Sequence, residues 1–312
     1  MHLTIGIATW NRADLLAETL ASLGSLRVPQ GVTWDVLVCD NNSTDHTRRV
    51  VEEAAAFAGC GASLRNKPGL ASVRHLFEPT QGKSHALNHL LREARGDWLL
   101  LLDDDVLVDE NWLCAYIEGM ARYPNAAVLG GAVRPRLTTT LTRRQQFLLD
   151  AYPSAFGVLN FSVDTPITMR TLTPGGANMA VRLDAARTIS YDTKAGMFPG
   201  VRVAGEDATM ALRIVERGHE GWMLAAAKVL HWTPVNTLNH KQIWHWQKGI
   251  GRSWILERGK PTPGKLGVPW WAWREMVRRY TRAMIRWRPW PDRRYCDAMI
   301  EAAQYWGYLT GK

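Results

Sequence analysis

Three consecutive carboxylates, Asp103, Asp104 and Asp105, follow the apolar run of residues 98–102. That run has the composition of a buried strand, so the carboxylates would lie where the chain leaves a hydrophobic core. Carboxylate oxygens suit Mg²⁺ or Mn²⁺, and such ions usually complete their coordination shell with water and substrate phosphates. The triplet therefore predicts a divalent-metal site for a nucleoside diphosphate. An acidic turn that solvates a strand end is the alternative explanation.

Polar side chains also follow two other apolar segments that we expect to be strands. Thr9, Asn11 and Arg12 follow the first segment, and Asp40 follows the second. Ligands of open α/β sheets bind beyond the carboxyl ends of the strands. We expect Asp40 to accept a hydrogen bond from a base or a ribose, and Arg12 to meet phosphate charge. Asn11 is also a residue type that caps helix N-termini, and the two roles are compatible.

Lys83 follows Gly82 where a helix is predicted to begin. A lysine in this place is a mobile cation suited to a diphosphate. The GxxxxGK[ST] spacing of a P-loop and the GxGxxG dinucleotide motif are both missing from the sequence. Their absence counts against a P-loop ATPase and a nicotinamide dehydrogenase.

Two later segments add groups that could contact a sugar or move a proton. Gly175 and Gly176 permit close backbone approach to a ligand next to Asn178, although a plain tight turn explains this segment equally well. Glu206 and Asp207 precede a predicted helix, whose dipole favours acidic residues in any case. One of these carboxylates could remove a proton from an acceptor hydroxyl.

A histidine lies at the end of the last predicted strand, in the pair His231-Trp232. A lone histidine is more often structural than a ligand. Imidazole nevertheless joins carboxylates readily on manganese, so His231 is a candidate metal ligand.

The segments that carry these groups alternate between strand and helix. Expected strands cover residues 3–8, 34–39, 72–77, 98–102 and 126–132, and expected helices cover residues 13–23, 44–57, 83–95 and 111–122. This order predicts an α/β fold with a mostly parallel, twisted sheet, Rossmann-like in its nucleotide-binding half and flanked by helices.

In this order the motifs resemble the family 2 glycosyltransferases, which are inverting enzymes of the GT-A fold. The resemblance spans residues 1–235 and includes a Thr-x-Asn-Arg start, Asp40, an Asp-x-Asp motif at 103–105, Gly-Gly-Ala-Asn at 175–178, Glu-Asp at 206–207 and a late histidine. Singly these motifs are weak. Together they are specific for the family, but not for its sugar.

The resemblance implies roles for the acidic residues on the donor side. Asp40 would recognise the base, and Asp103 would hold the ribose. Asp105 would bind Mn²⁺ or Mg²⁺ together with His231. Asp104 could exchange roles with either neighbour, because the triplet allows two registers.

The resemblance also implies roles on the acceptor side. Asp207 would be the general base, and Glu206 would orient the acceptor or the donor sugar. The remaining contacts would come from Thr9, Asn11, Arg12 and Lys83 on the nucleotide sugar, and from Gly175, Gly176, Asn178 and Trp232 on the acceptor or the sugar.

The implied reaction is a single displacement that inverts the anomeric carbon. The metal would offset charge on the departing nucleoside diphosphate while Asp207 activates an acceptor hydroxyl. UDP is the commonest donor nucleotide of the family, and GDP and dTDP also occur. The Gln-x-x-Arg-Trp motif of processive synthases is missing. We therefore expect one sugar or a few to be added to a lipid-linked or growing glycan in cell-surface polysaccharide synthesis.

Three other classes stay open on the sequence alone. A sugar nucleotidyltransferase would share the sheet and the metal, but the glycine-rich N-terminal loop with arginine expected there is missing. A nucleic-acid-binding protein would explain a basic, aromatic C-terminal part and leave the aspartates unexplained, so we do not expect nucleic acid as a partner. A non-catalytic glycan-binding protein would not need the metal and base positions, all of which are filled.

Composition predicts a globular, cytoplasmic protein. The chain of 312 residues is 46% hydrophobic, and it has no apolar run of the roughly 18 residues that a membrane span needs. It also starts without the charged and apolar regions of a secretory signal. Its cysteines show no CxxC spacing and are expected to be reduced; they are Cys39, Cys60, Cys114 and Cys296.

Positive charge and tryptophan are concentrated in the last quarter of the chain. Residues 241–312 hold 15 Lys and Arg against 5 Asp and Glu, a balance of +10, and nine of the 15 tryptophans. The whole chain carries +9, which leaves −1 for the rest. We therefore expect a catalytic domain over residues 1–238 and a basic, Trp-rich helical extension over residues 239–312, which would contact either the acceptor or a membrane surface.

One segment of this extension has the pattern of a basic amphipathic helix. The pattern suits the interface of an anionic membrane, so we expect peripheral contact with its inner face. The alternative is that the aromatic arc packs against the catalytic domain. The apolar arc contains Trp273, Met276, Val277, Tyr280, Met284 and Trp287, and beside it lie Arg274, Arg278, Arg282 and Arg286.

Overall fold

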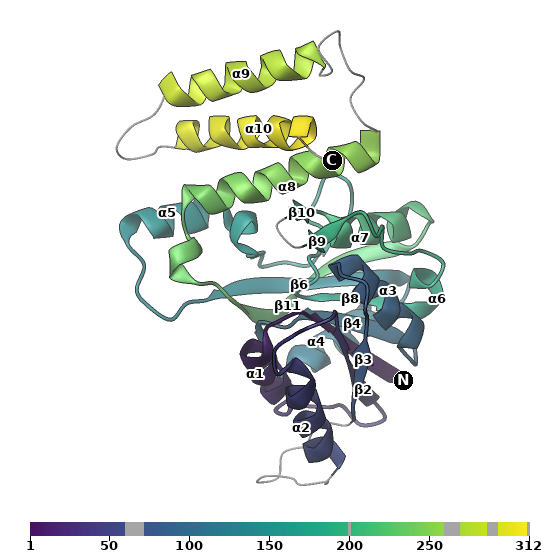
Figure 1. Ribbon diagram of the computed structural model, residues 1–312. Coiled ribbons are helices and arrows are strands. Elements are labelled where there is room, and N and C mark those ends of the chain that lie inside the picture. The colour runs from purple at the N-terminus through teal and green to yellow at the C-terminus, as the bar shows by residue number, and fades with distance from the viewer. Residues whose placement is uncertain (60–71, 199–200, 259–268, 286–292, 311–312) are drawn as a thin grey trace. The chain divides into compact units, whose positions relative to one another are not determined.

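A computed structural model describes residues 1–59, 72–198, 201–258, 269–285 and 293–310 (Figure 1). The chain divides into two compact units. The first, which we call the sheet unit, contains Met1–Arg136, Gly157–Thr193 and Glu206–Trp232. The second, the helical unit, contains Leu137–Phe156, Lys194–Gly205 and Thr233–Lys312.

The sheet unit is built on one nine-stranded sheet with the order β3-β2-β1-β4-β8-β6-β11-β5, and β7 pairs with β11. The strands are β1 (His2–Thr9), β2 (Thr33–Asp40), β3 (Val73–Phe77), β4 (Trp98–Asp103), β5 (Val106–Val108), β6 (Ala126–Arg136), β7 (Thr165–Pro166), β8 (Met179–Arg182) and β11 (Glu220–Trp232).

The first half of this sheet confirms the predicted βαβ order. Strand β1 pairs in parallel with β2 and with β4, and β2 pairs in parallel with β3. Strands in such a sheet are buried on both faces and therefore have continuous apolar sequences. In β4, Leu100 belongs to one hydrophobic cluster and its neighbours Leu99 and Leu101 belong to the other, because successive side chains point to opposite faces.

The second half of the sheet is mixed rather than parallel. Strand β8 runs antiparallel to both β4 and β6. Strand β11 is parallel to β6 but antiparallel to β5 and β7. The apolar pattern of such short strands indicates burial and not direction, so the sequence could not distinguish these pairings.

Helices cover both faces of the sheet, as predicted. Side chains of α1, α2 and α4 pack into one cluster, and side chains of α3, α6 and α7 pack into the other. The bounds are α1 (Ala13–Leu23), α2 (Thr47–Gly59), α3 (Lys83–Glu93), α4 (Trp112–Arg122), α6 (Leu183–Ala186) and α7 (Glu206–Glu216).

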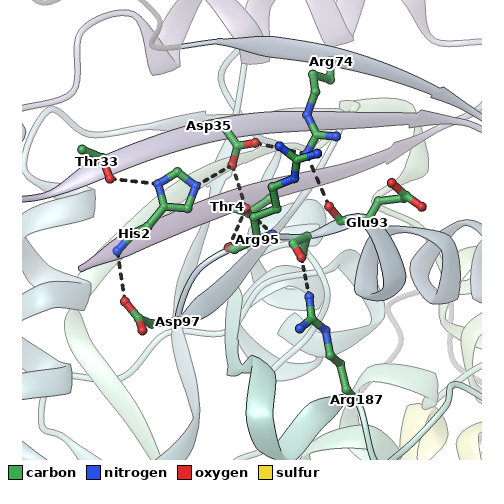
Figure 2. A network of polar contacts seen from close by, with 10 residues as sticks. His2, Thr4, Thr33, Asp35, Arg74, Glu93, Arg95, Asp97 and Arg187 are labelled. Carbon is green, nitrogen blue, oxygen red and sulfur yellow. Dashed lines mark hydrogen bonds and ion pairs between the residues drawn. The ribbon is translucent and has the colours of Figure 1, made fainter.

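A polar network ties together the edge at which β1, β2 and β4 begin (Figure 2). The buried Asp35 accepts hydrogen bonds from Thr4 Oγ1 at 2.7 Å and from Arg74 Nη2 at 3.3 Å. The Nε2 atom of His2 lies 3.5 Å from the same carboxylate, and its backbone N–H donates to Asp97 at 3.0 Å. This network holds the strands in register at the edge away from their carboxyl ends.

The helical unit combines its three long helices with two earlier segments of the chain. Helix α10 packs against both α8 and α9. A Cβ atom on Gly251 of α8 would overlap the carbonyl oxygen of Gln304 in α10, so these two helix backbones touch. The elements are α5 (Arg143–Ala151), η1 (Pro153–Phe156), β9 (Gly196–Phe198), β10 (Val201–Val203), η2 (Val235–Thr237), α8 (His240–Arg258), α9 (Trp270–Ile285) and α10 (Arg293–Thr310).

Among the described helices, none combines the length and the apolar character needed to cross a bilayer. The thiols of Cys39 and Cys114 are free, and Cys60 lies outside the described residues.

Candidate active site

The carboxyl ends of β2, β1 and β4 bring the first predicted residues together. Strand β1 lies between the other two, with Thr9 aligned to Asp40 and Ala8 aligned to Asp103. The chain leaves β1 towards β2 on one side and returns through β4 on the other, so the strand order reverses here. Such a reversal is where open α/β sheets bind their ligands.

The central carboxylate of the triplet is turned into the protein. Asp104 is buried, and it accepts hydrogen bonds from Thr9 Oγ1 at 2.7 Å and from Arg12 Nη1 at 3.1 Å. Burial, outweighing the opposing effect of Arg12, raises the pKa of Asp104 to about 6. Thr9 and Asp104 therefore anchor the triplet to β1.

Arg12 makes its contacts with the triplet itself. Its guanidinium lies 2.6 Å from an oxygen of Asp105 as well as bonding to Asp104. Burial lowers the pKa of Arg12, but the opposing effect of the two carboxylates is larger and raises the pKa well above its ordinary value. Arg12 thus neutralises part of the acidic cluster in this structure, and any contact with phosphate would require it to move.

The outer carboxylates of the triplet meet the late histidine. One ligand atom each from Asp103, Asp105 and His231 lie within 4.8 Å of one another. The Nε2 atom of His231 is 3.4 Å from Asp105 Oδ1. The pairing of β11 with β5 aligns His231 with Val106, and the next backbone N–H, of Trp232, donates to the carbonyl oxygen of Asp105 at 2.9 Å.

These three side chains suit a divalent metal. Oδ1 of Asp105 is buried and accepts no hydrogen bond from the described residues, although His231 Nε2 lies 3.4 Å from it, which is consistent with an oxygen that binds a cation. Two carboxylates and one imidazole are a donor set that Mn²⁺ accepts well, while Mg²⁺ prefers oxygen alone. Asp103, assigned from the resemblance to the ribose, would therefore also lie within reach of an ion held by Asp105 and His231.

The backbone at Gly157 packs against the ring of His231. Gly157 has a φ of +71°, and a Cβ atom there would lie 2.9 Å from Cε1 of His231. Only glycine combines this backbone conformation with so close an approach. Gly157 could not be predicted as a site residue, because nothing in its local sequence indicates that it meets a residue more than 70 positions away.

Lys83 bridges the triplet and the predicted base. Its Nζ donates to Asp103 Oδ1 at 2.8 Å and lies 3.7 Å from Asp207 Oδ2. Burial lowers the pKa of Lys83, but the carboxylates of Asp103 and Asp207 more than compensate and raise it above its ordinary value. The ammonium is therefore charged at neutral pH and placed for a diphosphate.

The loop before Lys83 is held by a buried asparagine, Asn41, which was not among the predicted site residues. Asn41 Oδ1 accepts a hydrogen bond from the backbone N–H of Gly82 at 2.7 Å, and its amide donates to the carbonyl oxygen of Thr80 at 2.6 Å. Gly82 itself has a φ of +138°, which other residues adopt only with strain. Asn41 thus sets the position at which α3 begins.

Asp207 lies in the first turn of α7, and its two carboxylate oxygens have different surroundings. The backbone N–H of Gly176 donates to Oδ2 at 2.8 Å, whereas Oδ1 is buried without a hydrogen-bond donor among the described residues. Burial, partly offset by Lys83, raises the pKa of Asp207 to about 7. A carboxylate with this pKa and an uncommitted oxygen is suited to accept a proton at neutral pH.

The other residues predicted for the acceptor side have different surroundings. A Cβ atom on Gly175 would meet nothing within 4 Å, so its backbone faces open space. Glu206 is partly exposed at the start of α7. The ring of Trp232 is partly buried, and the guanidinium carbon of Arg136 lies 5.4 Å from its centroid.

The side chain of Asn178 is used inside the protein. Its oxygen accepts from Trp112 Nε1 and Tyr116 Oη, both at 2.9 Å, and its amide donates to two backbone carbonyls at 2.9 and 3.0 Å. An asparagine side chain has two donor and two acceptor positions, and all are filled. A contact with sugar at this loop would therefore have to come from the backbone next to it.

The loops after β1 and β2 are tied to each other by Asn11. Its side-chain oxygen accepts from the backbone N–H of Thr44 at 2.7 Å, and its φ is +51°. Asn11 does not cap α1. The backbone N–H of Ala13, at the start of that helix, donates instead to Asp45 at 3.1 Å. Asp40 is buried beside them, and one of its oxygens accepts from the N–H of Ser43 at 2.8 Å.

Comparison with family sequence models gives two matches. The model described as glycosyl transferase family 2 matches residues 4–183, and the model described as glycosyl transferase family group 2 matches residues 98–306. Each match covers more than half of the chain.

Curated relatives share part of the chain. The succinoglycan biosynthesis protein ExoM of Rhizobium meliloti is 34% identical over 143 residues, which are 46% of this chain and 42% of the relative. The poly-beta-1,6-N-acetyl-D-glucosamine synthase of Staphylococcus epidermidis is 21% identical over 185 residues, which are 59% of this chain and 40% of the relative. The chain thus spans less than half the length of these relatives.

Solved structures share the fold. The mannosyltransferase PcManGT of Pyrobaculum calidifontis, in complex with GDP-Man and Mn²⁺, has a TM-score of 0.57 at 19% identity and covers 84% of this chain and 66% of that one. TarS of S. aureus, in complex with UDP-GlcNAc, has a TM-score of 0.53 at 15% identity, with coverages of 98% and 90%. These likenesses confirm the predicted α/β fold of the GT-A type with a C-terminal helical part.

Proposed function

Because the chain belongs to glycosyl transferase family 2 and is therefore a glycosyltransferase, we propose that it transfers a sugar from a nucleoside-diphosphate sugar to an acceptor hydroxyl, with inversion at the anomeric carbon. One observation carries the proposal. Lys83 lies between Asp103, a member of the candidate metal group, and Asp207, the candidate base. A leaving diphosphate and a proton acceptor would thus flank the same space.

On the donor side, Asp103, Asp105 and His231 would hold Mn²⁺ or Mg²⁺. A bound divalent ion would offset the negative charge of the departing nucleoside diphosphate. Lys83 would add a second positive charge once its ammonium turns from Asp103 to the phosphates. The nucleotide sugars bound by the structural neighbours, GDP-Man and UDP-GlcNAc, support UDP or GDP as the nucleotide here.

On the acceptor side, Asp207 would act as the general base. Its Oδ1 atom, which has no hydrogen-bond donor among the described residues, would take the proton from the acceptor hydroxyl as the hydroxyl oxygen attacks the anomeric carbon. The bond from that carbon to the phosphate oxygen breaks at the same time, and the nucleoside diphosphate leaves from the opposite face. Gly176 would orient the base, and Glu206 would orient the acceptor or the donor sugar.

The acceptor is proposed from the curated relatives. Their names refer to succinoglycan biosynthesis and to poly-beta-1,6-N-acetyl-D-glucosamine synthesis. A lipid-linked or growing glycan would therefore be the acceptor, and the enzyme would act at the inner face of the membrane in cell-surface polysaccharide synthesis.

Thermal shift with nucleoside diphosphates tests the donor site. UDP or GDP should raise the melting temperature in the presence of Mn²⁺ and much less in its absence, since a ligand at about 100 times its Kd adds about 2.7 kcal/mol of stability. Asp105→Ala should remove the Mn²⁺-dependent part of the shift. Asp14→Asn, which changes a side chain that is 93% exposed, is the control.

Turnover tests the base. Asp207→Asn should keep the Mn²⁺-dependent shift and lower kcat by about 10²- to 10⁴-fold, because the base is lost and the donor site is not. Release of nucleoside diphosphate rather than pyrophosphate should accompany transfer. Full activity of Asp207→Asn would refute the assignment of the base.

A further inference from the structure

Helix α9 uses only part of its circumference to pack inside the helical unit. Ala272, Met276 and Ala283 are buried, and α9 lies alongside α10 (Figure 1). Large apolar side chains on the remaining circumference are exposed. Among them, Trp270 is 71% exposed, Val277 48%, Met284 52% and Ile285 79%.

The exposed part of α9 consists of two neighbouring strips. Residues of the apolar strip follow one another at steps of three or four, and the arginines advance in steps of four beside them, so each set lies along one line of the helix. We define the apolar strip as Trp270, Trp273, Val277, Tyr280 and Met284, and the arginine strip as Arg274, Arg278 and Arg282. Arg286 and Trp287, which continue the pattern in the sequence, lie outside the described residues.

Glu275 is the one acidic residue of α9, and it bonds both to Arg278 of the arginine strip, at 2.8 Å, and to Arg279 on the inner side. Arg279 bonds to Glu275 and, at 2.8 Å, to Glu301 of α10, and it lies 4.8 Å from the ring centroid of Tyr305. Within Trp270–Ile285 there are four arginines and one glutamate, a balance of +3. The arginine strip therefore presents net positive charge next to the apolar strip.

We propose that this face of α9 binds the surface of an anionic bilayer. Contiguous exposed apolar patches mark interaction sites, and tryptophan and tyrosine combine an apolar body with a polar N–H or O–H that suits the boundary between headgroups and acyl chains. The arginines beside them would meet anionic headgroups. The two strips thus match the two layers of a bilayer interface.

Other occupants match only one of the two strips. A second copy of the chain joined through this face would bring arginine strips close to each other, and like charges oppose such contact. Nucleic acid would attract the arginines but would leave Val277, Met284 and Ile285 exposed to water. An anionic bilayer buries the apolar strip and neutralises the arginine strip together.

The inference rests on the proposed function only for its biological reason, which is that a lipid-linked acceptor requires an enzyme at the membrane. The surface itself is argued from α9 alone. Failure of vesicle binding with Mn²⁺-dependent nucleotide binding intact would remove this inference and leave the proposed function standing.

Co-sedimentation of the full chain with vesicles tests the proposal. The protein should bind vesicles of phosphatidylcholine with phosphatidylglycerol and stay in solution with phosphatidylcholine alone. Arg274→Ala/Arg282→Ala should weaken the partition coefficient on the order of 30-fold, from the contribution of two basic residues near an anionic surface. Val277→Ser/Met284→Ser should also weaken it, because the apolar contact is lost.

Matched controls separate the role of α9 from net charge and folding. Arg48→Ala/Arg49→Ala removes the same charge from exposed positions of α2 and should leave vesicle binding unchanged. Each variant should keep the helix content and melting temperature of the parent chain, since all the substituted side chains are exposed.

Three outcomes would overturn the proposal. One is equal sedimentation with neutral and anionic vesicles, or none with either. Another is equal loss of binding in the α2 control. The third is binding of oligonucleotides, or a dimer that dissociates in Val277→Ser/Met284→Ser, in a protein that does not bind vesicles.

Discussion

Asp207 and the carboxylates of the triplet are close together, but their surroundings give them different chemistry. Asp103 and Asp104 are each bonded to a cationic side chain, Lys83 and Arg12 respectively. Although burial raises the pKa of Asp103, the ammonium of Lys83 holds it below its ordinary value. Asp207 is farther from that ammonium and keeps a raised pKa, so one site contains both an ionised ligand and a proton acceptor.

The pKa of Asp207 predicts how activity depends on pH. A base must be deprotonated, and the pKa is raised to about 7, so kcat/KM should increase about tenfold per pH unit below that value and level off above it. Steady-state kinetics from about pH 5 to about pH 9 measure this profile of the free enzyme. A flat profile over that range would contradict the role of Asp207.

The same raised pKa predicts the effect of Asp207→Asn on stability. The ordinary value of this carboxyl is 3.8. Because the pKa of Asp207 is higher in the folded than in the unfolded chain, ionisation of this carboxyl lowers the free energy of unfolding at pH values above 3.8. Asparagine does not ionise and removes this loss. The melting temperature of Asp207→Asn at neutral pH should therefore not fall, which separates a lost base from a misfolded site.

Two adjacent glycines provide a matched pair of variants. A Cβ atom on Gly176 would lie 2.6 Å from Asp207 Oδ2 and 2.9 Å from Lys83 Nζ, whereas one on Gly175 would meet nothing within 4 Å. Gly176→Ala should displace the base and lower kcat on the order of 100-fold, the usual effect of a shift of about 1 Å at a reacting group.

Gly175→Ala should keep the parent melting temperature. The test is the difference in kcat between the two variants, and kcat should be lower for Gly176→Ala. Equal kcat for Gly176→Ala and the parent chain would show that the close approach of this backbone to Asp207 has no consequence for catalysis.

Among the elements, the two ends of the parallel strands β1, β2 and β4 contribute differently to the protein. Strands β1, β2 and β4 present candidate site residues at their carboxyl ends and are tied by the network of Asp35, Thr4 and His2 at the other edge. A rigid sheet places site residues more accurately than loops do. The polar network should therefore affect stability more than chemistry.

Asp35→Ala tests this division. The variant leaves the hydroxyl of Thr4 and the guanidinium of Arg74 without their buried partner, so the free energy of unfolding should fall by about 1–3 kcal/mol. Denaturant titration measures the change, and Asp14→Ala at an exposed position should cost about 0–1 kcal/mol. Equal losses in both variants, or loss of the Mn²⁺-dependent thermal shift in Asp35→Ala alone, would contradict the prediction.

At the scale of the whole molecule, the helical unit is assembled from three separate parts of the chain. The Tyr152 hydroxyl donates to Asp297 at 2.9 Å, and the Gln145 side chain donates to the carbonyl oxygen of Val235 at 3.0 Å. The backbone N–H of Ala204 donates to the carbonyl oxygen of Gly249 at 3.3 Å. The domain boundary proposed at residue 238 therefore separates segments that are bonded to each other.

A fragment of residues 1–238 tests the consequence. It would retain residues 137–156 and 194–205 without most of the helical unit around them. We expect lower solubility on expression and a lower melting temperature than for the full chain, because buried groups such as the Tyr152 hydroxyl lose their partners. A soluble fragment with the melting temperature of the full chain would instead support a boundary at residue 238.

Local sequence patterns were enough to predict the alternating elements of the parallel half of the sheet and the kinds of groups in the candidate site. The predicted helix over residues 13–23 has the bounds of α1, and the carboxylates of the triplet and His231 were identified by type and order. Periodicity and residue type depend on near neighbours in the chain, so both can be recognised locally.

Which of these groups meet depends on long-range packing in the folded chain. It turned Asp104 towards Thr9, used the side chain of Asn178 internally, and brought Gly157 against His231. These contacts join residues far apart in sequence, and they depend on the direction of strands such as β8 and on packing between layers. No local pattern encodes such distances, because many chain arrangements satisfy the same periodicity.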